Sequence, residues 1–214
     1  MIKAVIFDLD GTLLDTLPDI HDVLNHSLEK FLLPQIGIES TKKFVGNGAK
    51  KLVERAVGER AELLEIVYKN YSEEFANCFN NLTKMYPYEV ETLEKLKAAG
   101  VALSILTNKP QRATERVYSK FLEKYGFSIV LGQTEYYPLK PDPTSTFAIL
   151  EKLKVKKEEC IFVGDGDTDI QTAKAAGIKC VSALWGYRTR EELFAAGATD
   201  FAEDFTELEK YILQ

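Results

Sequence analysis

Several residue types are scarce in this chain of 214 residues, and each scarcity excludes a class of protein. The three cysteines, Cys78, Cys160 and Cys180, are odd in number, far apart and without a C-x-x-C pair. This usage favours reduced thiols in a cytoplasmic protein over a disulfide framework. With only His21 and His26 as histidines, the chain also has too few soft ligands for a zinc site.

Charge and hydropathy exclude two further classes. The net charge is −6 and no block of Lys or Arg interrupts the sequence, so we expect no nucleic-acid partner. No apolar run approaches the length of a membrane span, and the apolar run at residues 2–7 leaves no room for a signal peptide before it. We therefore expect a cytoplasmic protein without a membrane partner, as a monomer or homodimer.

Apolar runs and helical patterns alternate along much of the chain. Residues 2–7, 101–106, 128–131, 160–163 and 178–181 are predicted strands, and helical patterns separate each strand from the next. The first run is apolar without alternation, which is typical of a strand buried on both faces. Strands that alternate with helices predict an α/β fold with a doubly wound parallel sheet, a Rossmann-like core.

Residues 16–82 are helical in pattern and contain no predicted strand. One helix has its apolar face at Ile20, Leu24 and Leu28, and another covers about residues 59–79. Two shorter helices are predicted over residues 39–57, with a break near Gly46-Asn47-Gly48. We therefore predict that residues 16–82 form a helical domain inserted into a core domain of residues 1–15 and 83–214.

The first predicted strand is followed by Asp8-Leu9-Asp10-Gly11-Thr12. Ligands of open α/β sheets bind at the carboxyl ends of the strands, so chemistry is expected here. Two carboxylates this close raise one another's pKa unless a cation lies between them. By itself the segment is equally compatible with a β-turn after the strand, in which Asp8 is a cap.

Three further polar segments favour the functional interpretation, although each alone is compatible with an ordinary solvated loop. They are Thr107-Asn108-Lys109 after the strand 101–106, Lys140-Pro141, and Gly164-Asp165-Gly166-Asp167-Thr168-Asp169 after the strand 160–163. Together they bring Asp8, Asp10, Asp165 and Asp169 to one sheet edge with Thr107 and Lys140. So much negative charge requires a hard cation, and Mg²⁺ is the best candidate.

Other ligand-binding motifs do not match. In an EF-hand loop beginning at Asp165, position six would be Ile170 instead of glycine. No G-x-x-x-x-G-K-[ST] segment is present, which excludes a P-loop nucleotide enzyme.

The four segments resemble, in order and spacing, the four signature motifs of the haloacid dehalogenase-like hydrolases. The resemblance covers the whole chain, with residues 16–82 as a helical cap. Residues 15–20 and 44–49 are similar to the phosphoglycolate phosphatase branch of that family. Two departures concern substrate details: Gly166 stands where many relatives have serine, and Tyr88 where glycine commonly follows the hinge proline.

The resemblance implies a Mg²⁺-dependent phosphomonoester hydrolase with an aspartyl-phosphate intermediate. Asp8 would be the nucleophile and Asp10 the general acid and base. Mg²⁺ would be held by the Asp8 carboxylate, the Asp10 backbone carbonyl and Asp165. Asp169 would either ligate it through water or orient Lys140.

The phosphoryl oxygens would be held by Thr107, the Asn108 backbone N–H and Lys140. The partner is expected to be a small phosphorylated metabolite such as 2-phosphoglycolate. Its carboxylate would face the start of a helix at Gly48, near Lys50, Lys51 and Arg55. In the alternative interpretation this segment is only a hinge, and its cations are solvated.

Three other functions stay open at this point. They are a sugar-phosphate mutase, a pyrophosphatase, and a non-catalytic protein that binds phosphorylated metabolites. A true dehalogenase lacks the second acid, so Asp10 argues against that activity. Trp185-Gly186-Tyr187 is compatible with a rim of the site or with an aromatic loop packed on the surface of the domain.

Overall fold

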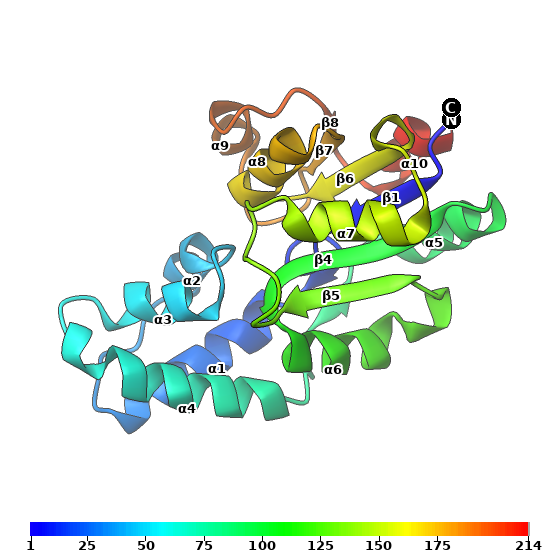
Figure 1. The fold of residues 1–214 in the computed structure, drawn as a ribbon. Helices are drawn as coiled ribbons and strands as arrows, with labels where there is room; N and C mark the ends of the chain where they lie inside the picture. The colour runs from blue at the N-terminus through cyan, green and yellow to red at the C-terminus, as the bar shows by residue number, and fades with distance from the viewer. Residues whose placement is uncertain (214) are drawn as a thin grey trace.

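A computed structural model describes residues 1–213 of the chain. Its centre is a parallel sheet in the order β5-β4-β1-β6-β7-β8, the doubly wound arrangement that the sequence predicts (Figure 1). The strands are β1 (Ala4–Phe7), β4 (Ala102–Pro110), β5 (Ile129–Gln133), β6 (Cys160–Gly164), β7 (Lys179–Ala183) and β8 (Phe201–Ala202). The flanking helices are α5 (Glu89–Ala98), α6 (Gln111–Phe121), α7 (Thr144–Leu153), α8 (Asp167–Ala176), α9 (Arg190–Ala195) and α10 (Phe205–Leu213).

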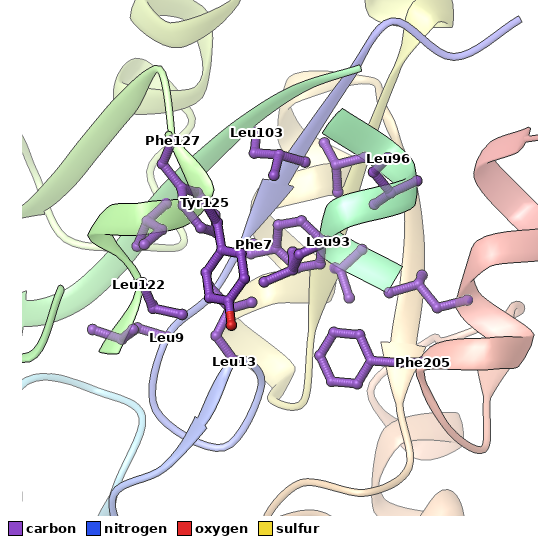
Figure 2. Close-up of a cluster of buried hydrophobic side chains, with 14 of the residues drawn as sticks. Phe7, Leu9, Leu13, Leu93, Leu96, Leu103, Leu122, Tyr125, Phe127 and Phe205 are labelled. Atoms are coloured by element: carbon purple, nitrogen blue, oxygen red, sulfur yellow. The ribbon is translucent and has the colours of Figure 1, made fainter. Parts of the chain in front are cut away.

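Strand β1 lies in the middle of the sheet, and both of its faces are buried. Val5 and Phe7 belong to a core cluster with residues of α5, α6 and α10, and Figure 2 shows Phe7 beside Leu93. Ala4 and Ile6 face the opposite cluster, to which α7 and α8 contribute. Burial on two faces is the physical reason for the unbroken apolar run at the start of the chain.

Strand β4 is longer than the sequence predicts. The apolar run ends at Leu106, but the strand continues to Pro110 after a shift in its register with β5. Thr107, Asn108 and Lys109 are therefore part of the strand, and all three are buried. The apolar pattern does not predict this burial, because the three residues are polar and the helical segment that covers them is distant in sequence.

The helical segment consists of α1 (Leu17–Lys30), α2 (Ile38–Phe44), α3 (Ala49–Val57), a 3₁₀ turn (Ala61–Leu63) and α4 (Leu64–Asn77). These helices share a hydrophobic cluster, to which Ala113 and Tyr187 of the core also belong, and gather at the end of the sheet to which the strand arrows point (Figure 1). The predicted break at 46–48 separates α2 from α3. None of the helices within residues 1–213 is long and apolar enough to cross a membrane.

Two very short strands, which the sequence analysis did not predict, connect the sheet to these helices. β2 (Leu14–Asp15) pairs antiparallel with β3 (Lys84–Met85). Close by, the buried Asp19 carboxylate accepts hydrogen bonds from the Leu82 N–H at 3.1 Å and the Thr83 hydroxyl at 2.6 Å. The two chain segments that connect the core to the helices are therefore hydrogen-bonded to each other.

Glu89, the first residue of α5, carries a carboxyl group that is entirely buried. Its Oε2 accepts the N–H of Tyr86 at 3.1 Å, and no donor within residues 1–213 reaches its Oε1. Burial raises the pKa of Glu89 well above its ordinary value. The charged form of this side chain therefore lowers the stability of the folded protein.

Glu89→Gln is expected to raise the free energy of unfolding at about pH 8, by roughly 1–3 kcal/mol, because the amide is isosteric and uncharged. The folded pKa is raised, so the stabilising contribution of Glu89 is complete below its unfolded pKa of about 4.5 and is lost as pH rises through the folded pKa. The advantage of the variant should therefore shrink toward about pH 5. Urea unfolding at both pH values measures the difference in free energy of unfolding between the variant and the wild type, and exposed Glu91→Gln is the control. An equal difference at both pH values would contradict the prediction.

Candidate active site

Three buried carboxylates meet at the carboxyl edge of the sheet. Asp8 follows β1, Asp165 follows β6, and Asp169 lies in the first turn of α8. Because β1 and β6 are paired neighbours, ligand oxygens of the three residues come within 4.8 Å of one another. Within residues 1–213, the buried Asp8 Oδ1 has no partner in hydrogen-bond geometry, although the Lys140 ammonium forms an ion pair with it at 2.8 Å. This oxygen-only donor set fits a hard divalent cation.

Glycines make room for these carboxylates. A side chain at Gly11 would overlap the Asp165 carboxylate, and its φ of +87° also favours glycine. A side chain at Gly164 would overlap Asp169, and one at Gly186 would overlap Asp165. The small residues around the acidic cluster are thus required by the close approach of its side chains.

Asp165 is held by two donors. The Thr12 hydroxyl donates to its Oδ1 at 2.8 Å, and the Tyr187 N–H donates to its Oδ2 at 2.8 Å. Burial, and then the negative charge of Asp8, raise the pKa of Asp165 to about 6. A cation at the cluster would counter both effects and favour the ionised carboxylate.

Lys140 supplies the positive charge beside this cluster. Its ammonium lies 2.8 Å from Asp8 Oδ1 and 2.6 Å from Asp169 Oδ1, with the side chain 2% exposed. Burial alone would lower the pKa of Lys140, but the attraction of Asp169 and Asp8 outweighs it and raises the pKa above its ordinary value. The lysine is therefore charged, and Asp169 is placed to orient it.

Asp10 has different surroundings from Asp8, two residues away. Its Oδ1 accepts hydrogen bonds from the Thr16 hydroxyl at 2.6 Å and from the Lys109 ammonium at 2.7 Å. Its carboxylate is not a member of the acidic cluster. The sequence analysis assigned no role to Lys109, whose side chain is only 1% exposed.

Asp8 and Asp10 line the same cavity, which has a volume of about 50 Å³. Thr107, Asn108 and Lys109 complete its wall on the sheet side. The opposite wall comes from the helical segment and is largely apolar: Ile20, Val45, Ala49, Leu52, Tyr71 and Phe75. The cavity therefore has a polar floor with two acids and an apolar roof.

Comparison with known proteins identifies the family. The profile of the haloacid dehalogenase-like hydrolases matches residues 5–183. The chain belongs to this family. It is 32% identical to the phosphoglycolate phosphatase of Vibrio parahaemolyticus, over 97% of this chain and 94% of that one. It is 36% identical to that of Pseudomonas savastanoi pv. phaseolicola, over 86% and 70%.

A solved structure supports the same assignment. A predicted phosphoglycolate phosphatase from Haemophilus somnus 129PT superimposes with a TM-score of 0.91 at 30% identity, covering all of this chain and 98% of the other. The α/β core with its helical insertion is thus shared along the whole length of this haloacid dehalogenase-like hydrolase.

In this hydrolase, Asn108 links the core to the helical segment. Its side-chain amide donates to the carbonyl oxygens of Gly46 and Lys140, both at 3.1 Å, and its Oδ1 accepts the Lys140 N–H at 2.8 Å. Both N–H groups of the amide are used, so the side chain of Asn108 has no donor left for a substrate. Thr107 lines the cavity and accepts the Lys109 N–H at 3.2 Å.

Gly48 lines the cavity, but the cations near it do not. Lys50 pairs with Glu65 and Lys51 with Glu54, each at 2.7 Å. Arg55 donates to the Phe44 carbonyl oxygen at 2.8 Å and to Asn47 Oδ1 at 2.7 Å. These three cations are held by partners within the helical segment, and of the predicted carboxylate site only Gly48 lines the cavity.

The aromatic segment after β7 packs behind the acidic cluster. Trp185 Nε1 donates to the Thr12 carbonyl oxygen at 2.8 Å, and the Tyr187 hydroxyl accepts the Thr16 N–H at 3.0 Å. Of the two roles left open by the sequence, packing on the core domain is the one observed, with direct contacts to the residues that hold Asp165 and Asp10.

Arg188, the next residue, reaches across to the helical segment. Its guanidinium donates to the carbonyl oxygens of Lys42 at 2.8 Å, Lys43 at 3.3 Å and Val45 at 2.7 Å. These carbonyls lie at the C-terminal end of α2, where a positive charge is favourable. Residues 185–188, named here the connecting segment, therefore contact the acidic cluster and the helices at once.

Proposed function

We propose that this haloacid dehalogenase-like hydrolase is a phosphatase, which hydrolyses small phosphomonoesters through an aspartyl-phosphate on Asp8. The observation that carries this proposal is the contrast between the two acids of the cavity. Asp8 lies in the carboxylate cluster beside Lys140, whereas Asp10 is hydrogen-bonded separately by Thr16 and Lys109. The two acids thus have separate partners, as two distinct roles in one reaction require.

The proposed reaction has two steps. In the first, a carboxylate oxygen of Asp8 attacks phosphorus, the bond to the ester oxygen breaks, and Asp10 gives that oxygen a proton. In the second, Asp10 takes a proton from water, whose oxygen attacks phosphorus and releases Asp8 and inorganic phosphate. Thr107, the Asn108 N–H and Lys140 would hold the phosphoryl oxygens and neutralise their charge.

We also propose Mg²⁺ as the cofactor of this site. The Asp8 and Asp165 carboxylates and the Asp10 backbone carbonyl would hold it, with Asp169 orienting Lys140. Bound Mg²⁺ would supply positive charge that reduces the repulsion between the Asp8 carboxylate and the phosphoryl group. Residues 16–82 would serve as a cap domain that excludes bulk water from the cavity.

For the substrate we propose 2-phosphoglycolate. The two relatives described above carry this activity in their names, and the cavity is small. Its roof offers a single side-chain hydroxyl, that of Tyr71, so most of the hydroxyl groups of a sugar phosphate would stay unpaired on binding. This observation favours a small leaving group over a sugar.

A panel of phosphomonoesters tests the proposed function. Phosphate release with Mg²⁺ is measured for 2-phosphoglycolate, an aryl phosphate, glucose phosphates, a nucleotide and pyrophosphate. We expect the highest kcat/KM for 2-phosphoglycolate. Equal values across the panel would leave a general phosphatase, and preferential pyrophosphate cleavage would make it a pyrophosphatase. Phosphate moved within a sugar phosphate would indicate a mutase, and binding without release a non-catalytic protein.

Arg188→Ala is expected to raise the KM for the best substrate, with a smaller effect on kcat, because three charge-assisted hydrogen bonds to the cap are lost. The loss in kcat/KM should be about 10- to 100-fold. Arg190→Ala is the matched control, since Arg190 pairs with Glu203 at the surface. Steady-state kinetics measure both variants, and wild-type constants for Arg188→Ala would show that these bonds do not support closure.

A further inference from the structure

Lys109 is a buried cation to which the proposed reaction assigns no role. It follows Thr107 and Asn108 in β4, and its side chain is 1% exposed. The ammonium lies 2.7 Å from Asp10 Oδ1 and 4.4 Å from the centre of the Phe75 ring, a residue of cap helix α4. It thus lies where core and cap meet, directly beside the proposed proton donor.

Lys109 is also the one cationic side chain among the described residues that line the cavity. Lys140 is not among the residues that line the cavity and is paired with two carboxylates. The cap lysines nearest in sequence, Lys50 and Lys51, are engaged by glutamates outside the cavity. A second negative charge on a bound substrate would therefore meet Lys109 before any other cation.

The ammonium has donors to spare for such a charge. It has three N–H groups, and among residues 1–213 its one hydrogen bond is to Asp10. Asp10 in turn keeps a second donor, the Thr16 hydroxyl at 2.6 Å. Lys109 is therefore able to bind a further anion while Asp10 stays in place. The Phe75 face adds a favourable cation–π contact without using an N–H group.

We propose that Lys109 binds a carboxylate on the leaving group and so makes the enzyme select phosphate esters of small hydroxy acids over those of neutral alcohols. This inference rests on the proposed function, because it assumes that Asp10 contacts the ester oxygen. A carboxylate one carbon from that oxygen lies within reach of a cation that itself touches Asp10. The specificity then comes from the core strand β4, in place of the cap cations that the sequence suggested.

The test compares two substrates of nearly the same size, 2-phosphoglycolate and ethyl phosphate, in the wild type, Lys109→Met and Lys109→Arg. Lys109→Met should lose about 10- to 100-fold more kcat/KM on 2-phosphoglycolate than on ethyl phosphate, the usual worth of a hydrogen bond to a charged group. Lys109→Arg keeps the charge and should keep most of the preference. Lys51→Met, which removes an exposed paired lysine, is the matched control and should leave the ratio unchanged.

A binding measurement separates this role from a simple effect on Asp10. Calorimetry with 3-phosphonopropionate and propylphosphonate, which cannot be hydrolysed, needs a folded protein but no turnover. The wild type should bind the carboxylate-bearing phosphonate at least about 10-fold more tightly, and Lys109→Met should not discriminate. Lys109→Gln serves if the methionine variant does not fold.

The outcomes are distinguishable. Equal losses on both substrates together with retained discrimination in binding would overturn the proposal and leave Lys109 as a residue that only positions Asp10. Absence of hydrolysis of both esters by the wild type would instead contradict the proposed function.

Discussion

Asp8→Asn is expected to lower kcat by at least about 10⁴-fold and to abolish the aspartyl-phosphate, because the amide oxygen is a poor nucleophile. The fold should persist. The substitution is isosteric, and Lys140 keeps its ion pair with Asp169 at 2.6 Å. Rapid quench with a labelled phosphomonoester measures the covalent intermediate, and a phosphate mimic such as beryllium fluoride should be retained by the wild type alone.

Asp167→Asn is the matched control, since Asp167 lies in the same acidic run as Asp165 and Asp169 but outside the cluster of three carboxylates. It should keep turnover within a few-fold of the wild type. Substantial turnover by Asp8→Asn, with a normally folded protein, would remove Asp8 from the role of nucleophile.

Removal of divalent metal is expected to have an effect of similar size. Exhaustive chelation should abolish phosphate release, and Mg²⁺ should restore it. Ca²⁺ should restore it poorly, because Ca²⁺ takes more ligands at longer distances and would displace the phosphoryl group from Asp8. Initial rates across a titration of each metal give the measurement.

Thermal unfolding gives a second test of the metal site. Mg²⁺ should raise the melting temperature of the wild type, by the linkage between binding and folding, and should do so less in Asp165→Asn. Full activity after chelation, or equal stabilisation of both proteins, would contradict the assignment of this cluster as a metal site.

The sheet and the acidic cluster could be predicted from sequence because they follow from one rule. An apolar run marks a buried strand, parallel strands end at the same edge, and polar residues after each run must therefore meet. Asp8 and Asp165 are brought together in this way by the pairing of β1 with β6. The apolar runs predict which residues end strands, whereas the order of the strands, which makes β1 and β6 neighbours, comes from the structure.

Other features depend on contacts between distant segments and could not be predicted. Lys109 follows an apolar run and resembles a solvated turn residue until α4 is seen to cover it. The cap cations near Gly48 looked available because their partners, such as Glu65 for Lys50, are set by helix packing. The strands β2 and β3 are too short to give a pattern of two-residue period.

The connecting segment has a thermodynamic consequence. Tyr187 holds Asp165, and the adjacent Arg188 holds the cap, so occupancy of the acidic cluster and the position of the cap share one short piece of backbone. If an ion at Asp165 favours the closed cap, a closed cap must favour that ion by the same factor. Such an enzyme would hold its metal weakly between turnovers and strongly during them, so that metal exchange and substrate exchange would occur in the same open interval.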